Sequence, residues 1–76
     1  MENSVTAKII NTTSVGKIDK GALTVTFTNT GGTAVTVAGD TLDAGDSETF
    51  PAIPGAVYRE IDYDPQSSSL RIQETR

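Results

Sequence analysis

Apolar and polar residues alternate with a period of two from Leu23 to Thr28, and this pattern constrains the fold more than any other feature of the sequence. Leu23, Val25 and Phe27 occupy the odd positions, and threonines occupy the even ones. Successive side chains of a strand point to opposite faces, so the spacing predicts a half-buried β-strand rich in β-branched residues. No window shows the i, i+3, i+4, i+7 spacing of an amphipathic helix for two turns, and we therefore predict no helix.

Other segments repeat the alternation more loosely, and Gly, Pro, Asn and Asp residues separate them. The further expected strands cover residues 5–10, 34–38, 47–50, 57–63 and 69–73. Residues 11–21 are the least patterned, which indicates a long connection or a weak hairpin. The Asn-Thr-Gly-Gly-Thr sequence at 29–33 predicts a hairpin loop between the strands that flank it.

These signals predict an all-β fold, namely a small antiparallel β-sandwich or partly open barrel of six to seven short strands, in a single domain over residues 1–76. The inward positions of the strands predict the core. The predicted core residues are Val5, Ile9, Leu23, Val25, Phe27, Val35, Val37, Leu42, Ile61, Leu70 and Ile72.

The 76-residue chain contains neither Cys nor His. Without Cys there are no disulfides or thiolate zinc sites, and without His the commonest transition-metal ligand and the usual general base are missing. A core of this size barely offsets the conformational entropy lost on folding, and small domains commonly gain stability from cross-links, metals or association. We therefore expect association with other subunits, with both chain ends held by the fold or by neighbours.

The charge pattern bears on possible partners. Six Lys and Arg against ten Asp and Glu give a net charge of -4. The cations are spread rather than clustered, so we expect no nucleic-acid partner. The start of the sequence lacks a basic region followed by a long apolar run, and no run approaches the ~20 residues of a membrane span. We therefore expect neither a signal peptide nor a membrane partner.

Four carboxylates lie within one short segment, at Asp40, Asp43, Asp46 and Glu48. A calcium site is one interpretation, because hard cations take oxygen ligands from loops. The spacing does not follow the EF-hand order of ligands, and Asp is common in turns because its side chain hydrogen-bonds nearby backbone. We favour solvated turn residues and assign no metal ligand.

Catalytic arrangements are poorly supported by the remaining residues. Glu60, Asp62 and Asp64 could supply a carboxylate pair of the glycosidase kind, but such an enzyme needs a substrate pocket that this chain can scarcely build. The Val-Gly-Lys sequence at 15–17 lacks the first glycine of a phosphate-binding loop. We predict a protein that is not an enzyme, with no catalytic residue and no cofactor.

Tyr58 and Ile10 each fall on the polar side of the alternation assigned to their segments. Aromatic and large aliphatic side chains on such a face can mark a protein–protein interface. Alternatively, each residue only covers a sheet edge or a loop, as singly exposed apolar residues often do. We name Tyr58 and Ile10 as the candidate interface residues.

A run of core and turn residues from Leu23 onward carries a resemblance. It comprises Phe27-x-Asn29-x-Gly31, Val35-x-Val37-x-Gly39-x-x-Leu42-x-x-Gly45-x-Ser47-x-x-Phe50, Tyr58-x-x-Ile61-x-Tyr63-Asp64 and Leu70-x-Ile72. This run, about two thirds of the chain, resembles small, acidic, cysteine-free all-β proteins from the structural gene modules of tailed bacteriophages and prophages. Its first half is also similar to immunoglobulin-like bacterial surface domains. No catalytic or binding residue is carried across by either resemblance.

The resemblance implies a virion component that is used in copies on a large assembly. We therefore expect a structural protein of a bacteriophage particle, namely a capsid decoration or an accessory of the head or tail. Its partners would be capsid or tail subunits, and it would form a homo-oligomer or dock on a lattice. The alternative is a stand-alone immunoglobulin-like binding module that recognises sugar or protein at a surface.

Overall fold

The computed structural model describes residues 4–76, which form eight β-strands and no helix. The strands are β1 (Ala7–Thr12), β2 (Gly16–Ile18), β3 (Thr24–Asn29), β4 (Val35–Val37), β5 (Asp40–Leu42), β6 (Ser47–Phe50), β7 (Ile61–Asp64) and β8 (Leu70–Thr75). The predicted all-β class is confirmed, although eight strands replace the expected six to seven. Two short strands account for the difference: β2 lies in the weakly patterned segment, and β5 follows a tight turn. No helix capable of crossing a membrane occurs among the described residues.

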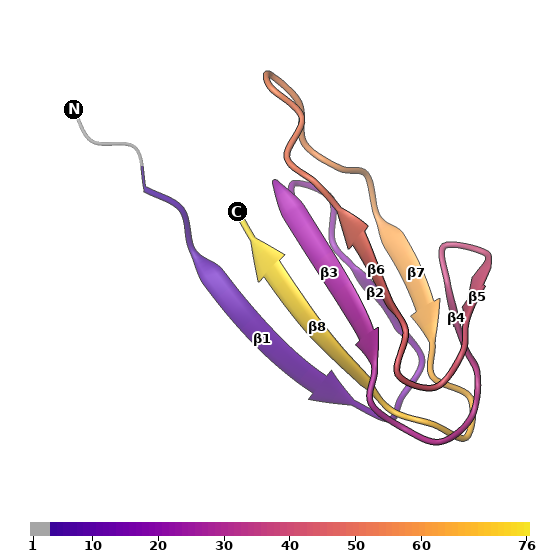
Figure 1. Ribbon diagram of the computed structural model, residues 1–76. Coiled ribbons are helices and arrows are strands. Elements are labelled where there is room, and N and C mark those ends of the chain that lie inside the picture. The colour runs from indigo at the N-terminus through magenta and orange to yellow at the C-terminus, as the bar shows by residue number, and fades with distance from the viewer. Residues whose placement is uncertain (1–3) are drawn as a thin grey trace.

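The strands form two antiparallel four-stranded sheets, in the orders β1-β8-β3-β6 and β2-β7-β4-β5 (Figure 1). β1 pairs with β8, β2 with β7, β3 with β6 and β4 with β5. These nested pairs correspond to one long hairpin whose turn lies between β4 and β5. Rolling this hairpin also brings β8 beside β3 and β7 beside β4. Such a two-sheet roll of eight strands is a jelly-roll arrangement. The predicted antiparallel sandwich is therefore confirmed.

The core lies between the two sheets and is centred on Phe27. The Phe27 ring is fully buried and meets Phe50 of its own sheet edge-on, with ring centroids 5.8 Å apart. Its ring also packs against that of Tyr63 in the opposite sheet, with ring centroids 5.9 Å apart. The correctly predicted buried residues are Val25, Phe27, Val35, Val37, Leu42, Ile61, Leu70 and Ile72. Ile18 and Ala22 are buried as well and were not predicted.

Three predicted core residues are wrong, two of them because the phase of β1 is opposite to the expected one. Val5 and Ile9 are 60% and 55% exposed, and Leu23 is only half-buried. Ile10 lies opposite the buried Ile72 of β8 and packs against the core. Residues directly opposite on antiparallel strands share a face, so this register turns Ile10 inward and Ile9 outward. The assignment of Ile10 to the polar face was therefore also wrong.

The predicted hairpin at residues 29–33 is also wrong, because β3 and β4 belong to different sheets. The segment crosses between the sheets and is organised by the buried Asn29 side chain. Its Nδ2 donates to the carbonyls of Thr33 (2.7 Å) and Leu42 (3.1 Å). Its Oδ1 accepts from the Gly31 N–H (3.0 Å) and the Ser68 hydroxyl (2.9 Å). The side-chain amide of Asn29 therefore forms hydrogen bonds with four polar groups in the segment that connects the two sheets.

A tight hairpin occurs instead between β4 and β5, whose end residues Val37 and Asp40 are paired. The two residues between them, Ala38 and Gly39, have φ angles of 50° and 85°. Two successive positive φ values match a type I′ turn, the turn whose twist best fits a two-residue hairpin.

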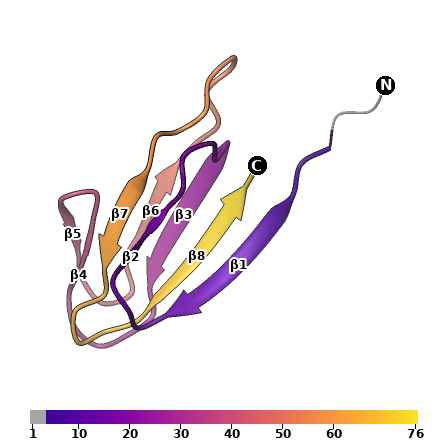
Figure 2. The ribbon, with the colours of Figure 1, turned by 180° about the vertical axis from the view of Figure 1, so that it is seen from behind.

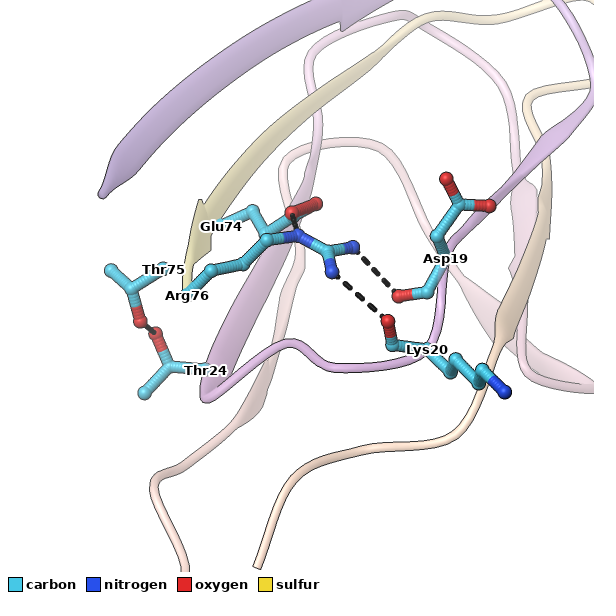
Figure 3. Close-up of polar contacts among 6 residues, drawn as sticks. All are labelled: Asp19, Lys20, Thr24, Glu74, Thr75 and Arg76. Carbon is cyan, nitrogen blue, oxygen red and sulfur yellow. Dashed lines mark hydrogen bonds and ion pairs between the residues drawn. The ribbon is translucent and has the colours of Figure 1, made fainter. Parts of the chain in front are cut away.

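The end of the chain is held by both main-chain and side-chain contacts. Thr6 and Arg76 exchange two main-chain hydrogen bonds, of 2.8 and 2.9 Å. The Arg76 guanidinium reaches the carbonyls of Asp19 and Lys20, and beside it the Thr24 and Thr75 hydroxyls share a hydrogen bond (Figure 3). The expectation of a held N-terminus concerns residues 1–3, which lie outside the described residues.

Candidate interaction surface

The connection between β6 and β7 projects beyond the ends of the strands, as both views of the ribbon show (Figures 1 and 2). Its residues 51–57 have the sequence Pro-Ala-Ile-Pro-Gly-Ala-Val, and all seven are exposed. Ile53 and Val57 are the largest of these side chains and are 52% and 58% exposed. We call residues 51–57 the apolar loop. It contains no side chain that carries a charge or a hydrogen-bonding group.

The apolar loop folds over a shallow open hollow of about 500 Å³, lined by Leu23 and residues 52–57. A turn closes the tip, where the Ala56 N–H donates to the Ile53 carbonyl over 3.1 Å. Gly55 has a φ of 77° there, a conformation that most L-residues avoid. The half-buried position of Leu23 follows from this arrangement, because its side chain lines the hollow instead of the core.

Tyr58 fixes the base of the apolar loop. Its ring is half-buried and meets Phe50 edge-on, with centroids 5.6 Å apart, and its hydroxyl donates to the Pro51 carbonyl. The Tyr58 N–H donates to the Ala22 carbonyl (2.8 Å), and its carbonyl accepts from the Gly21 N–H (2.9 Å). These contacts clamp the end of the loop to its beginning and to the segment before β3.

The two predicted interface residues thus lie in different places. Both are partly buried and pack against the core, Ile10 from β1 and Tyr58 from the base of the apolar loop. Sequence reasoning missed Ile53 and Val57. The sequence did contain a signal for this surface, namely seven consecutive residues, 51–57, without a charged or hydrogen-bonding side chain. The Pro and Gly residues among them were interpreted only as breaks between strands.

The carboxylates of the 40–48 segment occupy a hairpin strand, a turn and an edge strand. The Asp46 N–H donates to the Asp43 carbonyl over 3.0 Å, as in a turn. Nowhere in residues 4–76 do three or more carboxylates, thiols or imidazoles gather in a group that could hold a metal ion. Burial raises the pKa of Glu48, and the neighbouring Asp40 carboxylate raises it further.

Two of the other acidic residues have local side-chain partners. Glu60 forms an ion pair with Lys17 at 2.8 Å, and Asp64 accepts from the Gln66 N–H at 2.8 Å. Ser14 and Lys17 have the Ser-x-x-Lys spacing found in some serine enzymes. The contact with Glu60 raises the pKa of Lys17. A general base needs the opposite shift, so this lysine is poorly suited to activate a serine.

Comparison of the chain with family models, curated proteins and solved structures finds no match. The surface and the topology are therefore the observations from which a function can be proposed. Of the surface features, the apolar loop is the one that a lone chain in water has least reason to display, because contiguous exposed apolar groups commonly mark interaction sites.

Proposed function

We propose that the chain is a non-enzymatic structural protein of a bacteriophage particle, which docks on capsid or tail subunits as a decoration or as an accessory of the head or tail. The observation that carries the proposal is the exposed apolar loop. Ile53 and Val57 project from a tip without polar side chains, while Tyr58 anchors its base. An apolar contact presented on an anchored support loses little conformational entropy on binding, which favours protein–protein association.

The chemistry of the hollow beneath this loop favours a protein surface over a sugar as the partner. Sugar sites need converging polar groups, whereas this hollow is lined by Leu23 and residues 52–57. The jelly-roll topology is also used by viral capsid proteins and by lectins. This parallel is an analogy of architecture, because one fold serves many functions.

Co-sedimentation with particles that lack the chain tests this proposal. The wild-type chain should sediment with particles prepared from a strain in which its gene is deleted. A double variant, Ile53→Asp with Val57→Asp, should lose most of this binding, because it places two charges in the apolar contact. Val15→Asp is the matched control, since Val15 is 71% exposed in the connection between β1 and β2, at the other end of the strands (Figure 1).

The control and the double variant should have far-ultraviolet circular dichroism spectra like that of the wild-type chain. Equal binding by all three chains would reject the apolar loop as the contact. A folded wild-type chain that ignores both heads and tails would reject the particle as partner and leave the stand-alone binding module as the better interpretation.

A further inference from the structure

Four strands lie at the edges of the two sheets: β1 and β6 in one, β2 and β5 in the other. Edge strands expose unpaired main-chain groups, and proteins protect them by shortness, by proline or by inward-pointing charge. β2 and β5 have three residues each, and β6 has four, carries the half-buried Glu48 and is followed by Pro51. β1 has six residues, Ala-Lys-Ile-Ile-Asn-Thr, with no proline or glycine and one charge.

The hydrogen-bond pattern of β1 shows which of its main-chain groups are free. Thr6 and Arg76 exchange two hydrogen bonds, so every second residue from Thr6 onward directs its N–H and C=O groups toward β8. The residues between them, Ala7, Ile9 and Asn11, direct these groups toward the open edge. The edge therefore presents three evenly spaced donor–acceptor pairs, centred on Ile9.

We propose that β1 pairs with β1 of a second copy of the chain, antiparallel and about a two-fold axis that passes beside Ile9. In this register Ile9 lies opposite Ile9 of the second copy, and Ala7 lies opposite Asn11 of the second copy. Each of these pairs can exchange both of its main-chain hydrogen bonds. Centring the axis on Ala7 or Asn11 would leave two of the three outward-directed residues without a partner within the strand.

The side chains of β1 fit this self-pairing. Ile9 is 55% exposed, and in the pair it would cover the same side chain of the other copy. Lys8, the one charged residue of β1, would lie opposite Ile10 of the second copy rather than opposite another lysine. No like charges therefore face each other across the pair, although the chain as a whole carries a net charge of -4. The contact would extend one sheet of each copy into a continuous eight-stranded sheet.

Disulfide trapping tests this register directly, because the chain contains no cysteine. Opposite residues in a hydrogen-bonded pair have Cα atoms about 5.5 Å apart, within the range of about 4.4 to 6.8 Å that a disulfide spans. Ile9→Cys should therefore form a covalent dimer under mild oxidation. Asn11→Cys is the matched control on the same face of the same strand. Two copies of residue 11 would be displaced by four residues, about 13 to 14 Å, and should cross-link poorly.

Sedimentation equilibrium provides the second measurement. The wild-type chain should approach twice its 8.0 kDa mass as its concentration rises. Ile9→Lys should raise the dissociation constant at least about tenfold, since it places two like charges opposite each other and removes the apolar contact. Val15→Lys, which makes the same change at an exposed residue outside β1, should leave the dissociation constant unchanged.

A chain that stays monomeric, or one in which Ile9→Cys and Asn11→Cys cross-link equally, would overturn the proposed pairing. Both measurements use the isolated chain. Their failure is therefore distinguishable from a failure to bind particles, and self-pairing could hold even if the chain never joins a particle.

Discussion

The guanidinium of Arg76 donates a hydrogen bond to the main-chain carbonyl of Asp19, 57 residues earlier in the chain, over 2.7 Å (Figure 3). It also donates to the Lys20 carbonyl over 3.0 Å, and its Nε forms an ion pair with Glu74. Arg76 follows β8 of one sheet, whereas Asp19 and Lys20 follow β2 of the other. One side chain thus ties the two sheets together and neutralises Glu74, which is only 6% exposed.

We expect Arg76→Ala to lower the free energy of unfolding by about 1 to 3 kcal/mol, because it leaves the buried Glu74 carboxylate and two carbonyls without their partner. Arg76→Lys should recover only part of this loss, since an ammonium lacks the planar fork that reaches several acceptors together. Urea unfolding measures both effects. The exposed Arg71 serves as the control, and an equal loss for Arg71→Ala would show that the Arg76 contacts are not responsible.

The pH dependence of stability should carry a contribution from Glu48. Its pKa is raised in the folded protein above the ordinary value of 4.5, first by burial and then by Asp40. The folded state therefore binds this proton more tightly than the unfolded state, and the contribution of Glu48 to stability falls as the pH rises through its folded pKa. Glu48→Gln has no such proton to lose, so its stability should rise relative to wild type between pH 4 and neutrality.

Urea unfolding of both chains at several pH values measures this difference. Asp40→Asn should reduce it, because the neighbouring negative charge is then absent. Parallel stability curves for wild type and Glu48→Gln would contradict the proposed origin of the effect.

Asn29→Ala should destabilise the protein by about 2 to 4 kcal/mol, since buried polar groups that lose a hydrogen-bonding partner are costly. Its side chain serves the carbonyls of Thr33 and Leu42 and accepts from two donors. Asn29→Asp should be at least as damaging, because it turns a carboxylate oxygen toward those carbonyls. Thermal unfolding of both variants, with exposed Asn11→Ala as the control, tests this expectation.

Phe27→Ala should cost about 3 to 5 kcal/mol, the range for removing a large buried aromatic side chain. Phe27 is fully buried and contacts aromatic rings from both sheets. Differential scanning calorimetry should show a much lower Tm or no cooperative transition. A transition near that of the parent would contradict the central place of Phe27 in the core.

The period-two alternation was sufficient to predict the strand class and most of the core, because it is a local property of the chain. The phase of β1 could not be predicted in this way. Its adjacent Ile9 and Ile10 suit either face, and the choice is made by the register that sets Ile10 against Ile72. The role of Asn29 could not be predicted either, because a glycine-rich loop can form a hairpin or connect two sheets, and the local sequence does not distinguish the two.

The candidate surface was predicted less well than the fold. Tyr58 was named from its place on a polar face, yet its side chain belongs to the support of the apolar loop. Exposure of Ile53 and Val57 depends on how far the β6–β7 connection projects from the sheets, which no local pattern specifies. Apolar residues in a proline-containing loop can equally well fold back over a core.

Quantitative mass spectrometry of purified particles tests the proposed function most directly. Particles from the strain that encodes the chain should be compared with particles from the same strain after deletion of its gene. We predict that the chain is present in a fixed ratio to a major capsid or tail protein, remains bound through density-gradient purification and disappears on deletion. Complete, purified particles that never contain the chain, although the cells produce it, would contradict a role in the virion.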